Sequence, residues 1–431
     1  MRRREFLKSA GISVGVMGSV PLSGPLASPR AVMRANDWTS IRDQFALTDS
    51  YTHMATFLLP SHPKPVAEAI ERHRRAFDEN PAGYFHEKFF GMDQVIRTAA
   101  AEYMGGSETQ IALTDSTTMG LGLLYGGLKL RDGQEILTTR HDHYSTEIAL
   151  RQRAERTGAK VRYTRLYENP AAAGVDEIVT NLRAAIRPNT RVFAATWVHS
   201  STGVKLPLRK MADAIDEINR GRDAGDRVLF CVDGVHGFGI EDVRVDELGC
   251  DFFMAGTHKW VFGPRGTGVI WARDAAWKHA HPVIPSFGQN YAVWLGELTP
   301  DQVPVGCLMT PGGFHSFEHR WALPEAFRFH LDIGKARVRE RIHSLNTMAK
   351  EGLAGMKHVK LITPMSAGLS AGIICFEVAG YKPDAVVERL HEERILGSSS
   401  PYRVSYPRIA PSLINNEDEI EQTLRVIREM A

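Results

Sequence analysis

Short apolar and β-branched runs alternate with longer segments whose apolar side chains recur at helical spacing. Strands are predicted at Glu135–Thr139, Val161–Leu166, Val192–Val198, Val228–Val232, Asp251–Met254 and Thr267–Trp271. Helices are predicted at Pro65–Asn80, Thr118–Leu130, Glu147–Thr157, Val175–Ile186 and Leu208–Asn219. This alternation is typical of an α/β fold with a mostly parallel sheet covered by helices on both faces.

The pattern changes from about Phe314 onward. A long charged helix is predicted around Ala326–Met356, followed by a strand, a helix and a strand. We therefore expect a smaller C-terminal α+β domain at residues 326–431. The large domain, together with the N-terminal segment, is predicted at residues 31–325, and a length of 431 residues agrees with more than one domain.

The N-terminus has the features of an export signal. Residues Met1–Lys8 are basic, and Ser9–Leu22 are small or apolar without a charge, over a stretch too short to span a bilayer. Arg3-Arg4-x-Phe6-Leu7-Lys8 resembles the twin-arginine consensus. We expect residues 1–30 to be a signal read by the twin-arginine export machinery. The mature protein is then periplasmic or otherwise exported, without stable membrane insertion. Because this route carries folded proteins, the signal also suggests a cofactor.

Charge and cysteine content narrow the function further. The 52 Lys and Arg residues against 50 Asp and Glu residues leave a net charge of +2. The body of the chain contains no long basic run, so the charge distribution gives no indication of nucleic-acid binding. The spacing of Cys231, Cys250, Cys307 and Cys375 does not match a zinc or iron–sulfur motif. Cys231 and Cys375 lie in apolar runs and are predicted to be buried structural thiols.

A lysine and an aspartate follow two predicted strands. Lys259 comes just after Asp251–Met254 and is followed by the glycine-rich segment Gly263–Gly268. A lysine at such a place is usually a surface residue, but the aromatic and glycine neighbours favour a desolvated amine that can attack a carbonyl. Asp233 ends the run Val228–Val232, at the sheet edge where α/β proteins place ligand groups. By itself it could equally be a helix cap.

Asp233 and Lys259 together resemble the aspartate and lysine of fold type I pyridoxal-phosphate enzymes. Most of the chain resembles the class V aminotransferase family within that group. The segment from His258 to Gly268, with its HKW motif followed by GPxGxG, is similar to the isopenicillin N epimerase-like branch. The resemblance implies the fold type I architecture, pyridoxal 5'-phosphate as cofactor and a homodimer.

The resemblance also implies roles around the cofactor ring. Lys259 would bind the cofactor aldehyde covalently, and Asp233 would pair with the pyridinium nitrogen. His143 would stack on the ring, and His236 would lie near the ring hydroxyl edge. His143 and His141 could instead be two ligands of a metal, since alternate residues on a strand share a face, but no third ligand is obvious. We expect no metal.

A second motif matches the phosphate loop of the family. Ser116, Thr117 and Thr118 lie at the predicted N-terminus of an apolar helix, where backbone amides and hydroxyls favour a dianion. His258 is implied as an additional phosphate ligand. The alternative for the Ser/Thr residues is an ordinary helix N-cap.

Two further residues complete the expected site. Ser200 aligns with a family position near the ring hydroxyl that is often asparagine. Arg403, in Tyr402-Arg403-Val-Ser405, matches the arginine that binds the substrate α-carboxylate, a role that suits a planar guanidinium. No cysteine follows Cys375, so we do not expect the desulfurase activity found elsewhere in the family.

The resemblance implies an enzyme acting at the α-amino carbon of an amino acid, free or as a residue of a larger metabolite. Lys259, Asp233 and His143 are the expected catalytic residues. Transamination, epimerisation, elimination and oxidative decarboxylation remain open. One alternative is a periplasmic enzyme that modifies a glutamyl side chain of a siderophore, as in pyoverdine maturation. Others are a pyridoxal-phosphate-dependent lyase and a non-catalytic binding protein on the same scaffold.

Overall fold

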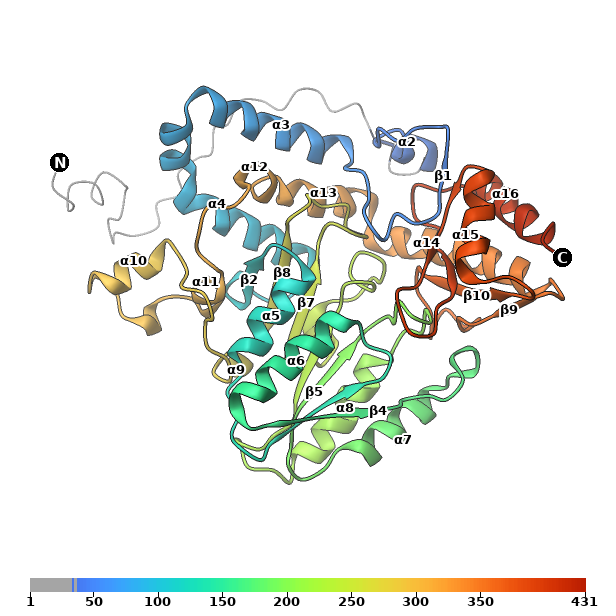
Figure 1. Cartoon of the computed structure of the whole chain (residues 1–431). Helices are drawn as coiled ribbons and strands as arrows, with labels where there is room; N and C mark the ends of the chain where they lie inside the picture. The colour runs from blue at the N-terminus through green and yellow to red at the C-terminus, as the bar shows by residue number, and fades with distance from the viewer. Residues whose placement is uncertain (1–32, 35–36) are drawn as a thin grey trace.

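A computed structural model describes residues 33–34 and 37–431, so the predicted export signal at residues 1–30 lies outside the described residues (Figure 1). A seven-stranded sheet forms its centre, in the order β2-β8-β7-β6-β5-β3-β4. The strands are β2 (Ile111–Thr114), β3 (Glu135–Thr139), β4 (Lys160–Thr164), β5 (Thr190–Thr196), β6 (Leu229–Asp233), β7 (Phe252–Gly256) and β8 (Gly268–Ala272). Neighbouring strands are parallel except where they pair with β8. The prediction of a mostly parallel sheet is confirmed.

Helices cover both faces of this sheet, with α4, α7 and α8 on one face and α5 and α6 on the other. The helices of this part of the chain are, in order, α2 (Trp38–Arg42), α3 (Lys64–Glu79), α4 (Pro81–Met104), α5 (Thr117–Gly127), α6 (Tyr144–Thr157), α7 (Val175–Ala185), α8 (Leu208–Asn219), α9 (Asp274–Trp277), α10 (Gln289–Trp294), α11 (Val305–Met309) and α12 (Phe317–Arg320). Side chains alternate across a strand, so Phe253 of β7 packs in the core under α4, α7 and α8. Phe252 and Met254 pack in the other core, under α5 and α6. Among the described residues, no helix combines the length and the apolar character needed to cross a membrane.

The C-terminal part forms a second, smaller sheet in the order β12-β13-β10-β9. Its elements are β9 (Val359–Leu361), β10 (Ile374–Val378), β12 (Ser398–Ser399) and β13 (Pro407–Ile409), covered by α15 (Pro383–Glu392) and α16 (Glu417–Arg428). The N-terminal segment reaches this unit, because β1 (Thr52–His53) pairs in parallel with β11 (Ile395–Leu396). Figure 1 shows these C-terminal elements, in orange and red, on the side of the molecule opposite α10 and α11.

The long helix predicted around Ala326–Met356 is two helices, so that prediction is wrong. Helix α13 covers Leu323–Ile333 and α14 covers Lys335–Ala354. They are separated by Gly334, whose φ of 93° a helix cannot accommodate. The first half of α14 packs in the core of the large unit and its second half packs in the C-terminal core. This helix therefore joins the two units.

Replacing glycine by alanine should have opposite effects on stability at two positions, Gly334 at the break between α13 and α14 and Gly122 inside α5. Gly334→Ala should lower the free energy of unfolding by about 1–3 kcal/mol, because alanine is strained at positive φ. Gly122→Ala, on the exposed face of α5 with open space around its Cβ position, should raise it by about 0.5–1 kcal/mol. Urea denaturation of both variants measures the two changes. If Gly334→Ala is as stable as the parent, the backbone at the break is relaxed and the strain argument fails.

Candidate active site

A cavity of about 180 Å³ lies at the edge of the central sheet where β2, β3, β5, β6 and β7 end. We call it the Lys259 cavity. Apart from Arg403, the sequence-predicted site residues all line it: Ser116, Thr117, Thr118, His143, Ser200, Asp233, His236, His258 and Lys259. The carboxyl ends of parallel strands meet at one sheet edge, which explains how loops far apart in the sequence converge here.

Lys259 lies in the turn after β7 and is partly buried. Removal from water lowers the pKa of its amine from 10.5 to about 8; the Asp233 carboxylate opposes this shift and the Arg408 charge adds to it. Near neutral pH, a much larger fraction of this amine is uncharged than in an exposed lysine. The structure therefore removes the Lys259 amine from water as predicted, and an uncharged amine is the form that can attack a carbonyl.

His236 orients the Lys259 amine. Its Nδ1 accepts a hydrogen bond from the indole N–H of Trp260 at 3.3 Å. An indole can only donate, so Nδ1 carries no proton. Burial keeps the pKa of His236 well below its usual value, and the neutral ring therefore carries its proton on Nε2. That atom lies 3.4 Å from Lys259 Nζ, where it can donate to the lone pair of the uncharged amine.

Asp233 ends β6 with only 2% of its surface exposed. Burial raises the pKa of its carboxyl to about 7, against the opposing effects of a hydrogen bond from the backbone N–H of Val235 and of the Lys259 charge. Such a buried carboxylate is stabilised by a cation placed against it. The protonated ring nitrogen of a pyridoxal cofactor supplies a cation of this kind, so Asp233 fits its expected role.

The part of the cavity formed by the N-terminus of α5 suits an anion. Ser116 is the N-cap of α5, its Oγ accepting from the Met119 N–H at 3.1 Å, so the helix-cap interpretation holds for this residue. A helix N-terminus also stabilises a bound phosphate, and the two roles are compatible. The Nδ1 atom of His258 is buried here without a hydrogen-bond partner among the described residues. An orphaned ring nitrogen beside a helix N-terminus fits a phosphate ligand.

His143 is the N-cap of α6, and its Nδ1 lies 3.1 Å from Ser145 Oγ. Burial and the Lys259 charge lower its pKa, so the ring is neutral and suited to stacking. His141 does not join it, since its ring stacks on Tyr167 at 4.2 Å. No three His, Cys, Asp or Glu residues in the described part of the chain are grouped as metal ligands. The two-histidine metal alternative therefore has no third ligand.

The structure corrects the choice of arginine. Arg403 is exposed, in the loop between β12 and β13, and does not line the Lys259 cavity. Arg408, on β13, is 3% exposed and does line it. A signal for Arg408 was available in the sequence, because it is the single charge in the run Pro407–Ala410. A charged residue inside such a run is buried only when it has partners.

Arg408 is held by the backbone and side chains of its own hairpin and of the large unit. Its Nε donates to Ser398 Oγ at 3.2 Å, Nη1 to the Ser200 carbonyl at 2.9 Å and Nη2 to the Ser399 carbonyl at 3.0 Å. Because a guanidinium has five N–H groups and three are used, two remain for a ligand carboxylate. Its charge also lies 4.9 Å from the ring centre of Phe57.

Sequence reasoning missed Phe57 and Tyr402 as well. Phe57 is 1% exposed, lines the Lys259 cavity and stacks on Trp260 with ring centres 6.3 Å apart. Tyr402 Oη lies 2.7 Å from Ser200 Oγ, so the C-terminal unit contacts both the side chain and the carbonyl of Ser200. Phe57 reaches the site through the pairing of β1 with the distant strand β11, and Tyr402 lies in the loop between β12 and β13.

The chain resembles known proteins over most of its length. The family model described as aminotransferase class-V matches residues 62–407. Isopenicillin N epimerase of Amycolatopsis lactamdurans is 24% identical, with 93% of this chain and 100% of that protein covered. A solved complex of the cystine C–S lyase C-DES with cysteine persulfide has a TM-score of 0.77 at 22% identity, over 88% of this chain and 98% of that chain. The apo cysteine desulfurase of Thermococcus onnurineus NA1 has a TM-score of 0.76 at 20% identity, over 91% and 97%.

The pKa of Lys259 predicts how the apoprotein captures an aldehyde. Only the uncharged amine attacks, so the rate of covalent capture of pyridoxal 5'-phosphate should rise with pH through about 8 and then level off. Borohydride quenching at timed intervals, followed by peptide mass analysis, measures modification of Lys259. The exposed Lys64 in the same digest is the control for modification of lysines outside the cavity. A midpoint near 10.5 for Lys259 would contradict the desolvation argument.

Proposed function

The chain belongs to the class V aminotransferase family, and from this premise we propose that it is a pyridoxal-phosphate-dependent enzyme acting at the α-amino carbon of an amino acid, free or within a larger metabolite. The observation that carries the proposal is the grouping of Lys259, Asp233 and Arg408 around one cavity. An amine with a lowered pKa, a buried carboxylate and a partly unused guanidinium match the three groups that such a reaction needs.

Pyridoxal phosphate, when bound, supplies an aldehyde for an amine and a ring that withdraws electrons from the substrate α-carbon. The residues of this chain do the rest. Asp233 would keep a proton on the ring nitrogen, and the α5 N-terminus with His258 would bind the phosphate. Lys259, with a pKa of about 8 and oriented by His236 Nε2, accepts a proton from the α-carbon and returns it.

Arg408 selects substrates by their α-carboxylate. Arg408 lines the cavity with two N–H groups unused, and its contacts to Ser200 and Ser399 fix the guanidinium plane. Because Arg408 and Lys259 line the same cavity, a substrate bound at its carboxylate by Arg408 would lie in the cavity that holds the Lys259 amine. Binding of the substrate and positioning of its α-carbon thus depend on the same anchor.

The relatives suggest different outcomes for the α-carbon, and the cysteines of this chain distinguish among them. Cys231, Cys250 and Cys375 are buried, and Cys307 lies in another cavity, so no cysteine lines the Lys259 cavity. A thiol nucleophile for desulfuration is therefore lacking. The likeness to isopenicillin N epimerase supports an epimerase-like or aminotransferase-like reaction, in which only protons move at the α-carbon before any amino-group transfer.

Incubating the purified holoenzyme with candidate amino acids and peptides in D₂O tests the proposal. Deuterium should appear at the α-carbon of true substrates, because Lys259 exchanges its protons with solvent. Chiral analysis of the recovered substrate then separates epimerisation from transamination, and a Lys259→Ala variant is the control. If no free or peptide-bound amino acid exchanges, while Lys259 still captures the cofactor, the chain binds without turnover.

Replacing each arginine tests the assignment of the carboxylate anchor. Arg408→Gln should weaken binding of a free amino acid about 10- to 100-fold, the scale of a hydrogen bond to a charged group, and Arg403→Gln should leave it within about twofold. The amide of the same amino acid should respond little to either change. Titration of the cofactor absorption band measures all four affinities. Equal losses for acid and amide in Arg408→Gln would mean that this residue supports the fold instead of binding the carboxylate.

Asp233→Asn tests the buried carboxylate. The variant should retain bound cofactor but lose turnover on the order of 100-fold, the scale of one preorganised electrostatic partner. An amide is isosteric and hydrogen-bonds to Val235 without a negative charge to hold the ring proton. Cofactor content from the absorption spectrum and deuterium exchange into substrate are measured on the same sample. Activity close to that of the parent enzyme would exclude this role for Asp233.

A further inference from the structure

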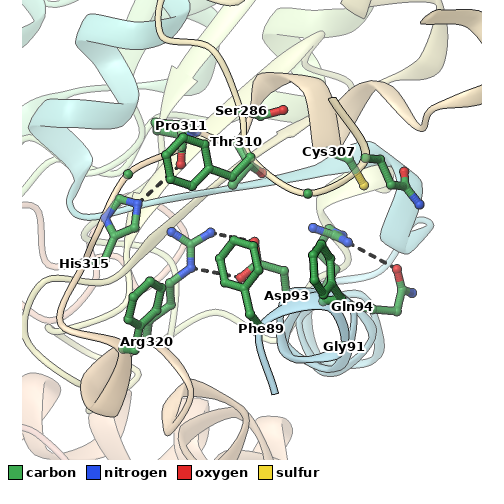
Figure 2. A pocket seen from close by; sticks show the side chains of 18 residues that line it. Phe89, Gly91, Asp93, Gln94, Ser286, Cys307, Thr310, Pro311, His315 and Arg320 are labelled. Carbon is green, nitrogen blue, oxygen red and sulfur yellow. Dashed lines mark hydrogen bonds and ion pairs between the residues drawn. The ribbon is translucent and has the colours of Figure 1, made fainter. Parts of the chain in front are cut away.

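Two cavities of the chain differ in how their polar side chains are engaged. In the cavity of about 400 Å³ beside α4, Arg320 donates to both carboxylate oxygens of Asp93, at 3.0 and 2.8 Å (Figure 2). These two groups satisfy each other and leave little for a ligand. In the Lys259 cavity, the hydroxyl of Ser200 is held from outside the cavity, by a residue of the C-terminal unit.

That residue is Tyr402, whose Oη lies 2.7 Å from Ser200 Oγ. Ser200 follows β5 and is 8% exposed, whereas Tyr402 lies in the loop between β12 and β13. The carbonyl of Ser400 fixes this loop, because it accepts from the Tyr402 N–H at 2.9 Å and from Ser405 Oγ at 2.7 Å. The phenol is therefore held against Ser200 before any ligand binds.

Burial indicates the direction of this hydrogen bond. It raises the pKa of the Tyr402 phenol to about 12, against the opposing effect of the bond to Ser200, so the phenol keeps its proton near neutral pH. Among the described residues, Ser200 is the hydrogen-bond partner of this phenol. If Ser200 donated, the phenol proton would have no acceptor among these residues, which is unfavourable away from water. With Tyr402 as the donor, the proton of Ser200 is left for a ligand.

The order of the strands places Ser200 beside one substituent of the cofactor ring. Pyridoxal phosphate carries its hydroxyl and its phosphate arm on the two carbons that flank the aldehyde-bearing carbon. Asp233, the expected partner of the ring nitrogen, ends β6. Thr117, at the anion-binding N-terminus of α5, accepts from the Gly256 N–H of β7 at 2.7 Å. With the phosphate on the β7 side of β6, the ring hydroxyl faces the β5 side, where Ser200 lies.

We propose that Tyr402 is a positioning residue for the cofactor: its O–H donates to Ser200 Oγ and directs the Ser200 proton to the oxygen of the ring hydroxyl. This inference rests on the proposed function, because it requires pyridoxal phosphate at Lys259. A hydrogen bond to the ring oxygen stabilises negative charge there. The charge is greatest when the nitrogen that joins Lys259 to the cofactor has lost its proton. The hydrogen bond therefore lowers the pH at which that proton is lost.

Titration of the cofactor absorption band with pH measures this effect without turnover. The band of the holoenzyme changes when the nitrogen that joins Lys259 to the cofactor loses its proton, and the midpoint of the change is compared. Ser200→Ala should raise the midpoint by about 0.5–1 pH unit, the scale of one neutral hydrogen bond. Tyr402→Phe should raise it by a smaller amount, because Ser200 keeps its hydroxyl but loses the partner that orients it. Both variants retain the bond from Arg408 to the backbone carbonyl of Ser200.

A double variant separates action through Ser200 from an independent effect of Tyr402. Ser200→Ala combined with Tyr402→Phe should have the midpoint of Ser200→Ala alone, because the phenol has no hydroxyl left to orient. Tyr163→Phe is the matched control. It removes a phenol that donates to Glu147 at 3.1 Å, away from the Lys259 cavity, and should leave the midpoint unchanged.

Three outcomes would overturn the inference. Unchanged midpoints in both single variants, with the cofactor still bound, would mean that the hydroxyl pair only links the two units. An equal shift from Tyr402→Phe with and without Ser200→Ala would mean that Tyr402 does not act through Ser200. A parent protein without an absorption band after reconstitution would remove the proposed function as well, so the two failures are distinguishable. If Ser200→Ala does not bind the cofactor, the midpoint of Tyr402→Phe alone decides the matter.

Discussion

Removal of the Lys259 amine from bulk water is the constraint on which the site depends. Burial lowers the pKa of this amine and raises that of Asp233, so the two groups approach the same protonation range. The turn after β6 brings His236 against the Lys259 amine, and the packing around this turn leaves no space for a side chain at two of its positions. A Cβ on Gly234 would lie 2.0 Å from the Phe253 ring, and one on Gly237 would lie 2.2 Å from Trp197. Both glycines are needed for this close packing.

Local patterns in the sequence were sufficient to predict many of the helices and strands. The predicted bounds of β3 and α8 agree with the structure, because alternation in the strand and amphipathic spacing in the helix are properties of neighbouring residues. The break at Gly334 was missed because the charged and apolar pattern continues through it. A single glycine inside a helical pattern is often tolerated, and only the backbone conformation shows that this one ends a helix.

The candidate site likewise contains residues that local motifs predict and residues that only the tertiary structure brings there. Lys259, Asp233 and Ser116 stand next to strand ends or a helix start, so short motifs indicated their places. The two arginines lie on one hairpin, and its pairing decides which of them is buried. Arg408 lines the cavity through the pairing of β13 with β10 and β12, so the isolated charge in its apolar run indicated that it is buried but not that it belongs to the site. Phe57 likewise arrives through the pairing of β1 with β11.

Ser200 links the two units of the chain at the edge of the Lys259 cavity. Its carbonyl accepts from Arg408 and its hydroxyl lies against Tyr402, both from the hairpin of β12 and β13. The C-terminal unit cannot swing away from the central sheet without withdrawing Arg408 from the cavity. A carboxylate bound by Arg408 would therefore add its binding free energy to the contact between the two units, so that substrate binding and the association of the units would be thermodynamically linked.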